Sequence, residues 1–384
     1  MFWPVSLMLS AALMGVLYLW STRTFPALRH RRRAVALSLG GLVVAQLVMR
    51  WIVVLWHFGN PVQTALIVVL MTLAMAAVPI AVMRVVGWLA ERIAKRRRPA
   101  APPPEGVMTR RQVVEAVGGV AMIGVTGATL GWGAIWGRHE FELVELPVRI
   151  AALPRALDGY VIAQVSDLHA GTYIGERELD EGFERVRRAK PDLVVVTGDM
   201  IDFDPAYAPL VARKLAELAP RDGVYACLGN HDYYTGWDEV VASLSAAGIH
   251  TLVNEGTVIR PRDGGGFALL GVDDRWGGRY GSPGPRLDDA LSTVPGSLPR
   301  ILLSHQPVTV DRWPGKVALQ LSGHTHGGQI NPGFRPVDLF MSYVAGLYRV
   351  GGTTLYVNRG FGTVGPPSRV GAPPEVTRIV LVAA

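Results

Sequence analysis

The sequence predicts an α/β region, built as a two-sheet β-sandwich flanked by helices, that follows an all-α transmembrane region of about four helices. Two observations support this prediction. From about Phe141 onward, short β-branched runs alternate with amphipathic helical segments, which indicates helices covering a sheet. Before that point, the chain carries apolar stretches of bilayer-crossing length. We therefore divide the chain into a helical membrane region at 1–136, a linker at 137–154 and an α/β domain at 155–384.

Four apolar segments make up the predicted membrane region. They are Phe2–Trp20, Ala34–Trp56, Val62 to about Ala90, and Val117–Trp136. A stretch of about 20 apolar residues is long enough to cross a bilayer as a helix. The fourth segment is rich in Gly and Ala, as closely packed membrane helices often are. The first segment lacks the basic n-region and the clear cleavage site of a signal peptide, so we interpret it as a span.

Basic residues flank these segments and predict their orientation. The net charge of +7 would by itself favour a nucleic-acid partner, but the cations gather at the ends of apolar segments, so no nucleic acid is expected. The basic runs 21–33 and 91–111 should be cytoplasmic, while the loop His57–Pro61 has no Lys or Arg. With four spans, everything after Gly137 is then extracytoplasmic.

Two further features of the membrane half bear on export and on flexibility. Thr109-Arg110-Arg111-Gln112-Val113 resembles a twin-arginine export signal, although we favour the interpretation that its arginines are the positive flank of the fourth segment. Both interpretations send the following domain to the same side. Pro99–Pro104 predicts a stiff linker.

The single cysteine, Cys227, cannot form an internal disulfide and lies in an apolar run typical of a buried thiol.

The α/β region begins with alternating strands and helices and then becomes richer in strands. We predict helices at Glu176–Ala189, Leu210–Leu218 and Trp237–Ala247. The predicted strands are Tyr160–Val165, Asp192–Thr197, Gly223–Leu228, Phe267–Val272, Arg300–Leu303, Val317–Leu321, Thr353–Val357 and Val376–Val382. Sequential strand–helix–strand units imply right-handed crossovers and a sheet covered by helices.

Five short polar signatures fall mostly where these strands end. They are Asp167-Leu168-His169, Gly198-Asp199-Met200-Ile201-Asp202, Gly229-Asn230-His231-Asp232, Ser304-His305-Gln306, and Gly323-His324-Thr325-His326-Gly327-Gly328. The carboxyl ends of strands in an open α/β sheet are the usual place for a site. Any one of these short motifs is more often a turn or surface feature than a site. The set of five in this order is not explained by coincidence.

The donor types predict a metal centre. Carboxylates, an amide oxygen and neutral imidazoles suit manganese, iron or zinc better than magnesium or calcium, and the absence of thiolates argues against a structural zinc site. Two adjacent cations can neutralise a phosphoester, orient it and lower the pKa of a water molecule. His231 follows Asn230 directly and could act as an acid or donate to the phosphoryl group, with Asp232 or Asp202 as its orienting partner.

At these residues the chain resembles the calcineurin-like metallophosphoesterase superfamily, over roughly residues 155–384. It is most similar to bacterial membrane-anchored phosphodiesterases that carry the motif Gly323–Gln329. The resemblance implies one metal held by Asp167, His169, Asp199 and His326, and a second held by Asp199, Asn230, His305 and His324. It also implies that His231 is the catalytic histidine, with Asp232 beside it. Many members carry Glu where this chain has Asp232.

These expectations together predict a membrane-anchored hydrolase of a phosphodiester or pyrophosphate that uses two divalent ions, with phospholipids or lipid-linked compounds as substrates. One alternative, also from the resemblance, is a cytoplasm-facing pyrophosphatase of UDP-2,3-diacylglucosamine type in lipid A synthesis. A second is a membrane transporter or sensor with an accessory phosphoesterase domain. A third, an inactive fold that only binds nucleotide or lipid, is disfavoured because every ligand position is filled.

Overall fold

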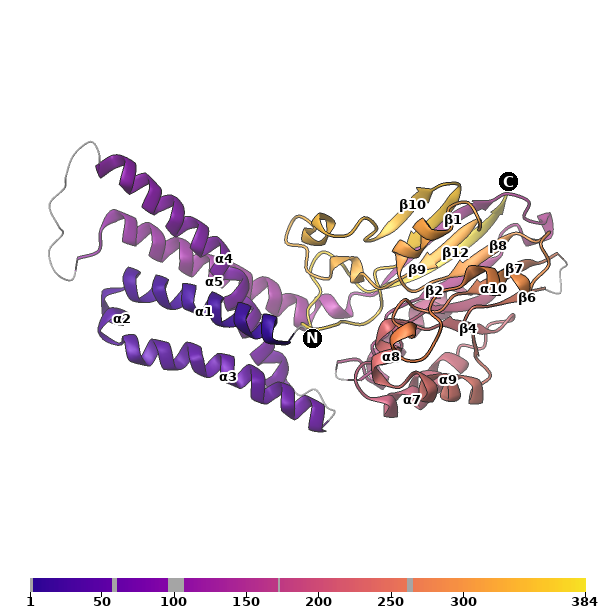
Figure 1. Cartoon of the computed structure of the whole chain (residues 1–384), viewed down its shortest axis with the longest axis horizontal. Coiled ribbons are helices and arrows are strands. Elements are labelled where there is room, and N and C mark those ends of the chain that lie inside the picture. Colours follow the sequence, from indigo (N-terminus) through magenta and orange to yellow (C-terminus); the bar gives the residue numbers. More distant parts are fainter. Residues whose placement is uncertain (1–2, 57–60, 96–106, 172, 261–264) are drawn as a thin grey trace. The chain divides into compact units, whose positions relative to one another are not determined.

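The computed structural model describes residues 3–56, 61–95, 107–171, 173–260 and 265–384 (Figure 1). The chain separates into a helical unit that extends to Ala134 and a second unit that begins at Ile135. Residues 57–60 of the predicted short loop and the predicted Pro99–Pro104 linker lie outside the described residues.

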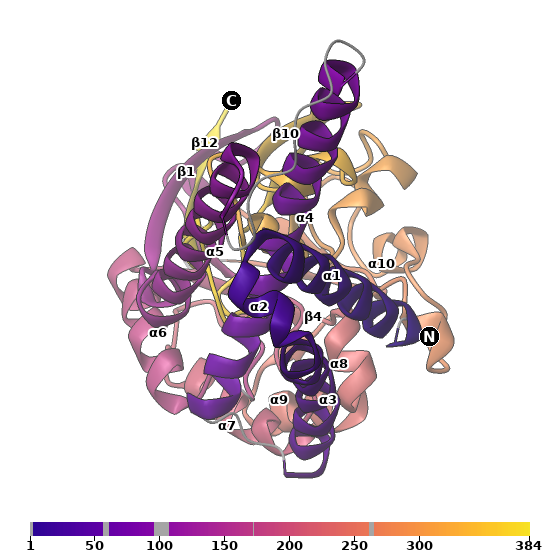
Figure 2. The ribbon, with the colours of Figure 1, turned by 90° about the vertical axis from the view of Figure 1, so that its left-hand side faces the viewer.

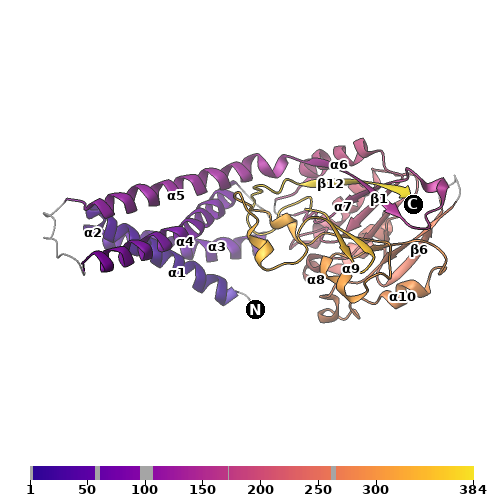
Figure 3. The ribbon, with the colours of Figure 1, turned by 90° about the horizontal axis from the view of Figure 1, so that it is seen from above.

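Helices form nearly all of the described part of the first unit. They are α1 (Trp3–Thr24), α2 (Pro26–His30), α3 (Arg32–Trp56), α4 (Pro61–Lys95) and α5 (Arg110–Ile135). Helix α1 packs against both α3 and α4, as the end-on view shows (Figure 2). The long helices α4 and α5 run lengthwise through the unit (Figure 3). A small apolar core that includes Leu17, Trp20 and Ile80 holds α1 against α4.

Two segments of this unit are long and apolar enough to cross a membrane. Among the described residues they are Val62–Ile93 and Arg110–His139, with mean hydropathies of 2.7 and 1.7. Only 28% and 22% of their most apolar windows are buried, whereas the core helix of a soluble protein would be mostly buried. Helices α1 and α3 lie where the other two membrane spans were predicted, but their described residues do not meet the same criterion of length and hydropathy. The predicted helices are therefore confirmed, but the predicted spans are supported for two segments rather than four.

The second unit contains two six-stranded mixed sheets. The first has the order β1-β12-β2-β3-β4-β5 and the second the order β10-β11-β9-β8-β7-β6. The strands of the first sheet are β1 (Glu142–Ile150), β2 (Val161–Val165), β3 (Leu193–Thr197), β4 (Val224–Cys227), β5 (His250–Thr251) and β12 (Glu375–Ala383). Those of the second are β6 (Glu255–Ile259), β7 (Phe267–Gly271), β8 (Arg300–Leu303), β9 (Leu319–Ser322), β10 (Gly346–Val350) and β11 (Thr353–Val357). In the first sheet β2, β3, β4 and β5 run parallel, and in the second β7, β8, β9 and β11 do so.

An apolar core fills the space between the two sheets, and helices cover their outer faces. Ile162 and Val195 of the first sheet belong to the same buried cluster as Leu269 and Leu303 of the second. Burying each such side chain contributes about 1.5–3 kcal/mol. The helices of this unit are α6 (Glu176–Ala189), α7 (Ala208–Ala216), α8 (Asn230–Thr235), α9 (Trp237–Ala246) and α10 (Leu287–Ser292). Residues of α6, α7, α8 and α9 share a core with the first sheet, and α10 shares one with the second. This is the helix-flanked sandwich that the sequence predicts.

The expected linker at 137–154 is different in the structure. It contains β1, which pairs in parallel with β12 along its whole length, from Glu142 opposite Glu375 to Ile150 opposite Ala383. Pro147 and the two glutamates obscure the strand pattern in the sequence. Because β1 is the edge strand of its sheet, it tolerates a proline that lacks an N–H donor. The α/β unit consequently begins well before residue 155.

Candidate metal centre

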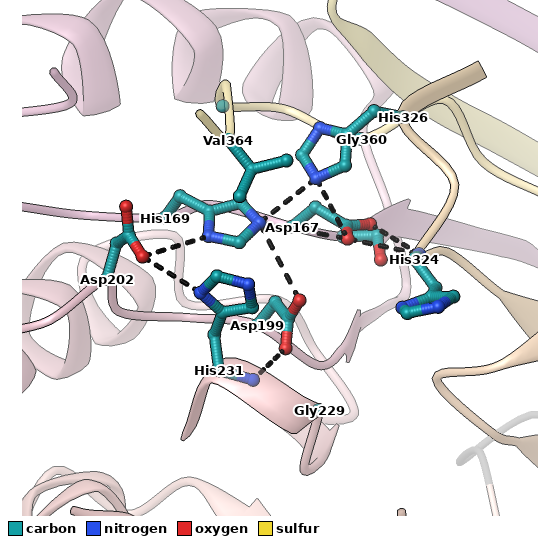
Figure 4. A network of polar contacts seen from close by, with 12 residues as sticks. Asp167, His169, Asp199, Asp202, Gly229, His231, His324, His326, Gly360 and Val364 are labelled. Carbon is teal, nitrogen blue, oxygen red and sulfur yellow. Dashed lines mark hydrogen bonds and ion pairs between the residues drawn. The ribbon is translucent and has the colours of Figure 1, made fainter. Parts of the chain in front are cut away.

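The five sequence signatures lie together at the carboxyl ends of parallel strands. Asp167 and His169 follow β2, Asp199 follows β3, and Asn230 and His231 open α8 directly after β4. His305 follows β8, while His324 and His326 follow β9. Figure 4 shows most of these side chains pointing toward one another. The two sheets thus contribute to a single site, as expected where parallel strands end at a common edge.

The backbone of the site lies largely in the left-handed region. The φ angles are +54° at Asp167, +48° at His169, +54° at Asp199, +74° at His324 and +52° at His326. This conformation is uncommon for residues other than Gly and costs roughly 1 kcal/mol or more per residue. It takes each chain segment out of the regular strand and aims neighbouring side chains at the same point. Strain of this kind concentrates at functional sites.

The first ligand group consists of Asp167, His169 and His326. Their donor atoms all lie within 4.8 Å of one another. His169 Nε2 is 3.0 Å from His326 Nε2, and His326 Nε2 is 3.5 Å from Asp167 Oδ1. Asp199 Oδ2 stands 3.6 Å from His169 Nε2, so this carboxylate also borders the group.

The second ligand group consists of Asp199, His305 and His324, again with all donor atoms within 4.8 Å. Asn230 joins it, because its Oδ1 lies 3.1 Å from His305 Nε2. The amide nitrogen of Asn230 donates to the hydroxyl of Tyr234 at 3.2 Å, which turns the amide oxygen toward the site. Asp199 therefore lies between the two groups, the position that a bridging carboxylate requires.

The acceptor atoms of the second ligand group are arranged as they would be around a bound cation. His305 Nδ1 is 2.8 Å from the backbone oxygen of Thr197 and so donates its proton there. In the neutral ring Nε2 is then an acceptor, yet it lies within 3.2 Å of Asp199 Oδ2, Asn230 Oδ1 and His324 Nδ1. Buried acceptors rarely face one another without a donor. A proton on His305 Nε2 or a divalent ion would supply the positive charge that these acceptors lack.

Burial sets the protonation state of the histidines. It lowers the pKa of His169 to about 4 and that of His324 to about 3, so both rings are neutral and suited to metal binding. Burial also disfavours the charged form of His305, but the charge of Asp199 outweighs it and raises the pKa of His305. A proton on His305 thus competes with a cation for the same carboxylate.

His231 lies directly beside the ligands, and one of its ring nitrogens is within 4.8 Å of donor atoms of His169 and Asp199. Its backbone N–H donates to Asp199 Oδ1 at 2.8 Å, and its ring packs edge-on against His169 with centroids 4.7 Å apart. Its Nδ1 is 2.8 Å from Asp202 Oδ1, so Asp202 orients the ring and leaves Nε2 for a substrate. Burial opposes protonation of His231, but Asp199 and Asp202 outweigh it and raise its pKa to about 9.

Asp232, expected to act beside His231, occupies a different place. It is fully buried, and its carboxylate accepts hydrogen bonds from the backbone N–H groups of Gly229 at 2.8 Å, Asp199 at 3.0 Å and Met200 at 2.8 Å. A carboxylate committed to three backbone donors cannot reach a substrate. The expectation of a catalytic role is therefore corrected: Asp232 is a positioning residue that joins the turn after β3 to the turn after β4.

Sequence reasoning missed Arg369. This side chain is 1% exposed, and its guanidinium donates to the backbone oxygens of Arg359, Gly360, Gly362 and Ala372. Its Nη2 also lies 3.2 Å from His326 Nδ1. Burial without a carboxylate partner lowers its pKa to about 9. The only signal in the sequence is a lone arginine within a Gly- and Pro-rich segment.

Two further arginines lie on loops that follow strands of the second sheet, Arg359 after β11 and Arg275 after β7. Arg359 forms ion pairs with Glu375 at 2.6 Å and with Glu142 at 2.7 Å, which commits it to holding the strand ends. Arg275 is an exposed residue. Among the aromatic residues of α8, Tyr234 packs against the His231 ring, whereas Tyr233 is buried and packs against Trp237.

Comparison with known proteins identifies the family. A family model described as calcineurin-like phosphoesterase matches residues 160–328. The chain is 33% identical over 284 residues to a metallophosphoesterase of Bacillus subtilis, YkuE, and the match covers 71% of this chain and 98% of that protein. This chain belongs to the calcineurin-like metallophosphoesterase family.

Other relatives of this metallophosphoesterase match a smaller share of each chain. It is 33% identical over 269 residues to a Danio rerio protein named transmembrane protein with metallophosphoesterase domain, a match that covers 67% of this chain and 61% of that protein. It is 37% identical over 238 residues to the metallophosphoesterase Cj0846 of Campylobacter jejuni, covering 61% of this chain and 62% of that one. The chain therefore has a metallophosphoesterase domain that contains clustered candidate metal ligands.

Proposed function

We propose that the chain is a membrane-anchored hydrolase that uses two divalent metal ions to cleave a phosphodiester or a pyrophosphate. The observation that supports this most directly is the pair of ligand groups on either side of Asp199. Asp167, His169, Asp199 and His326 would hold one ion, and Asp199, Asn230, His305 and His324 the other. Imidazole nitrogen mixed with hard oxygen favours manganese, iron or zinc.

The metal pair would neutralise the phosphoryl oxygens and activate water for attack on phosphorus. The residues of the chain would complete the site. With Nδ1 held by Asp202, the ring of His231 presents Nε2 outward, where it can donate a proton to the phosphoryl group or to the leaving oxygen. Asp202 lies outside both ligand groups, and its contact with Nδ1 favours the protonated ring that a general acid requires. Tyr234 and Phe203 pack against this ring and form an aromatic rim beside it.

The helical unit supports the membrane anchor. Two of its segments are long and apolar enough to span a bilayer, and two relatives are named transmembrane proteins. We propose that α1 and α3 cross the membrane as well, which makes four spans with the basic runs on the cytoplasmic side. The hydrolase unit would then be extracytoplasmic.

An exposed apolar loop supports a lipid substrate. After the His324–His326 turn, the chain carries Phe334, Leu339, Phe340 and Met341, whose exposed fractions are 64%, 78%, 86% and 38%. Large apolar side chains gathered on one loop are costly in water and typical of a surface that meets a membrane or an apolar ligand. We therefore propose phospholipids or lipid-linked phosphates as the substrate class, with membrane lipids as the surroundings of the enzyme.

The experiment that tests the function is hydrolysis by the full chain in a mild detergent with added manganese. The substrates are an aryl phosphodiester, an aryl phosphomonoester and inorganic pyrophosphate. We expect turnover of the diester or the pyrophosphate, abolished in Asp199→Ala and retained in Asp288→Asn, a substitution at an exposed position on α10. Failure of the wild-type protein to hydrolyse any of the three would contradict the enzyme proposal.

A further inference from the structure

The helical unit contains a polar cavity of about 530 Å³ that the proposed hydrolase does not use. It lies between the end of α1, the second half of α4 and the start of α5. Its polar lining comprises Arg23, Arg84, Glu91, Thr109, Arg111, Gln112 and Glu115. The volume is within the range of sites that bind small ligands. Polar and charged residues in a membrane unit are expensive, which makes this cavity a candidate for function.

Glu115 is the centre of the ion-pair network that lines the cavity. It is 5% exposed and accepts from Arg111 Nε at 2.6 Å, while Arg84 Nη1 stands 3.5 Å away. Arg111 also pairs with Glu91 at 2.6 Å. Both carboxylates are thus fully engaged by two arginines, and α4 is joined to α5.

One positive charge remains after these pairings. The cavity is lined by three arginines and two glutamates, so its formal charge is 3 − 2 = +1. Among the described residues, no carboxylate pairs with Arg23. The N-terminus of the 26-residue helix α5 adds to the positive potential, because it opens at this cavity. There Thr109 and Gln112 cap each other: the Gln112 N–H donates to Thr109 Oγ1, and the Thr109 N–H donates to Gln112 Oε1.

Part of the cavity lining is apolar. Val85 and Trp88 of α4 line it and are 56% and 48% exposed. Arg92 lies over the Trp88 ring, 4.8 Å from its centroid. A tryptophan with an apolar body and a polar partner is typical of the level at which lipid headgroups begin. The cavity therefore offers both cations and apolar side chains to a ligand.

We propose that this cavity binds a phosphate group carried by an anionic phospholipid. Arg23 and the exposed edge of Arg84 would contact the phosphate oxygens, since guanidinium groups form paired hydrogen bonds with phosphate. Val85 and Trp88 would contact the upper part of an acyl chain. Basic pockets between membrane helices on the cytoplasmic side are suited to anionic headgroups. This proposal also gives a role to Arg111 of the Arg110-Arg111 motif, because Arg111 forms the ion pairs that hold Glu91 and Glu115 at the cavity.

The test is lipid retention by the full chain in a neutral detergent, measured by native mass spectrometry after incubation with phosphatidylglycerol or with phosphatidylcholine. We expect the wild type to retain phosphatidylglycerol preferentially. Arg23→Gln should weaken this retention about tenfold, as expected for the loss of one charge-assisted hydrogen bond. Arg33→Gln removes an exposed charge from α3 outside the cavity and should retain the lipid like the wild type. Arg84→Lys, which keeps the charge but loses the guanidinium geometry, should weaken retention as well.

Unchanged helix content by circular dichroism shows that each variant is folded. Equal retention by Arg23→Gln and Arg33→Gln, or equal retention of the two lipids, would overturn the proposal. A final arm adds millimolar inorganic phosphate to the lipid-bound wild type. Displacement of the lipid would assign the cavity to a soluble phosphate and overturn its assignment to a lipid, whereas persistence of the lipid supports it.

Discussion

His231 Nδ1 lies 2.8 Å from Asp202 Oδ1, and Asp202 is itself 4% exposed. The pair resembles the arrangement in which a buried carboxylate fixes the tautomer and the orientation of a functional imidazole. Asp202 does not belong to either group of metal donors. Asp202 Oδ1 is also 4.0 Å from Nδ1 of the candidate ligand His169, so metal content has to be measured beside activity to separate the positioning of His231 from metal binding.

Asp202→Asn should lower kcat by about 10- to 100-fold, because the amide no longer holds the charged imidazole as firmly. KM and the bound metal should change little. Steady-state kinetics together with elemental analysis of the purified variant measure both quantities, with Asp288→Asn as the matched control on an exposed position. A parallel loss of metal and activity would show that Asp202 acts through the metals instead.

Asp232→Asn should destabilise the hydrolase unit. The amide would retain one acceptor oxygen but place its NH2 group against backbone N–H donors that the carboxylate now satisfies. Loss of a buried, charge-assisted acceptor costs roughly 2–3 kcal/mol. Thermal unfolding followed by tryptophan fluorescence should show a lower transition temperature, in the presence and in the absence of chelator. An unchanged transition with lost kcat would restore Asp232 to a catalytic role.

His324→Ala should remove one of the two metal ions that we propose, because only the second ligand group contains this side chain. Asp199→Ala should reduce occupancy of both sites, since this residue lies between them. Inductively coupled plasma mass spectrometry gives the metal content per chain. His250→Ala is the control, because His250 is exposed and stacks on Tyr225 away from the site. A wild-type content of one ion would contradict the binuclear proposal.

The apolar loop predicts a difference between substrates. The double substitution Leu339→Ser and Phe340→Ser removes the two most exposed apolar side chains of the loop. We expect it to lower hydrolysis of a vesicle-borne phospholipid severalfold while leaving hydrolysis of a soluble aryl phosphodiester unchanged. Leu143→Ser, an exposed leucine on β1, serves as the control. Equal loss on both substrates would indicate a defect of the site and not of lipid contact.

The proposed orientation predicts that protease added to intact spheroplasts digests the hydrolase unit. Immunoblotting against a C-terminal tag follows its loss, and a cytoplasmic marker protein confirms that the membrane stays sealed. Full protection would place the hydrolase unit in the cytoplasm. That result would favour the alternative of a cytoplasm-facing pyrophosphatase of a nucleotide-linked lipid.

Much of the architecture is encoded locally, and what escaped prediction depends on long-range contacts. The strands β2, β3 and β4 are mostly apolar runs followed by Gly or polar residues, so both the strands and the site at their ends could be predicted. Strand β1 could not, because its identity depends on pairing with β12, more than 200 residues later. The same holds for Asp232, whose partners follow β3.

Arg369 shows the same limit at the level of a single side chain. Its acceptors are backbone oxygens, which carry no sequence signature, and they converge only when the segment from Arg359 to Ala372 folds over the site. For the membrane half, periodicity and length predict the helices well. Composition alone is less decisive about which of them cross a bilayer.

The left-handed backbone at the metal centre has an evolutionary consequence. His169 adopts a φ of +48°, and its Nδ1 atom is buried without a hydrogen-bond partner. Glycine would relieve the strain at this position, so natural selection for a stable fold alone would not keep a histidine there. The same reasoning extends to Asp199, His324 and His326. A descendant protein that no longer catalyses the reaction should accumulate glycine and asparagine at these turns while it keeps the sandwich fold. A lineage that keeps the strained residues is one in which the reaction is still under selection.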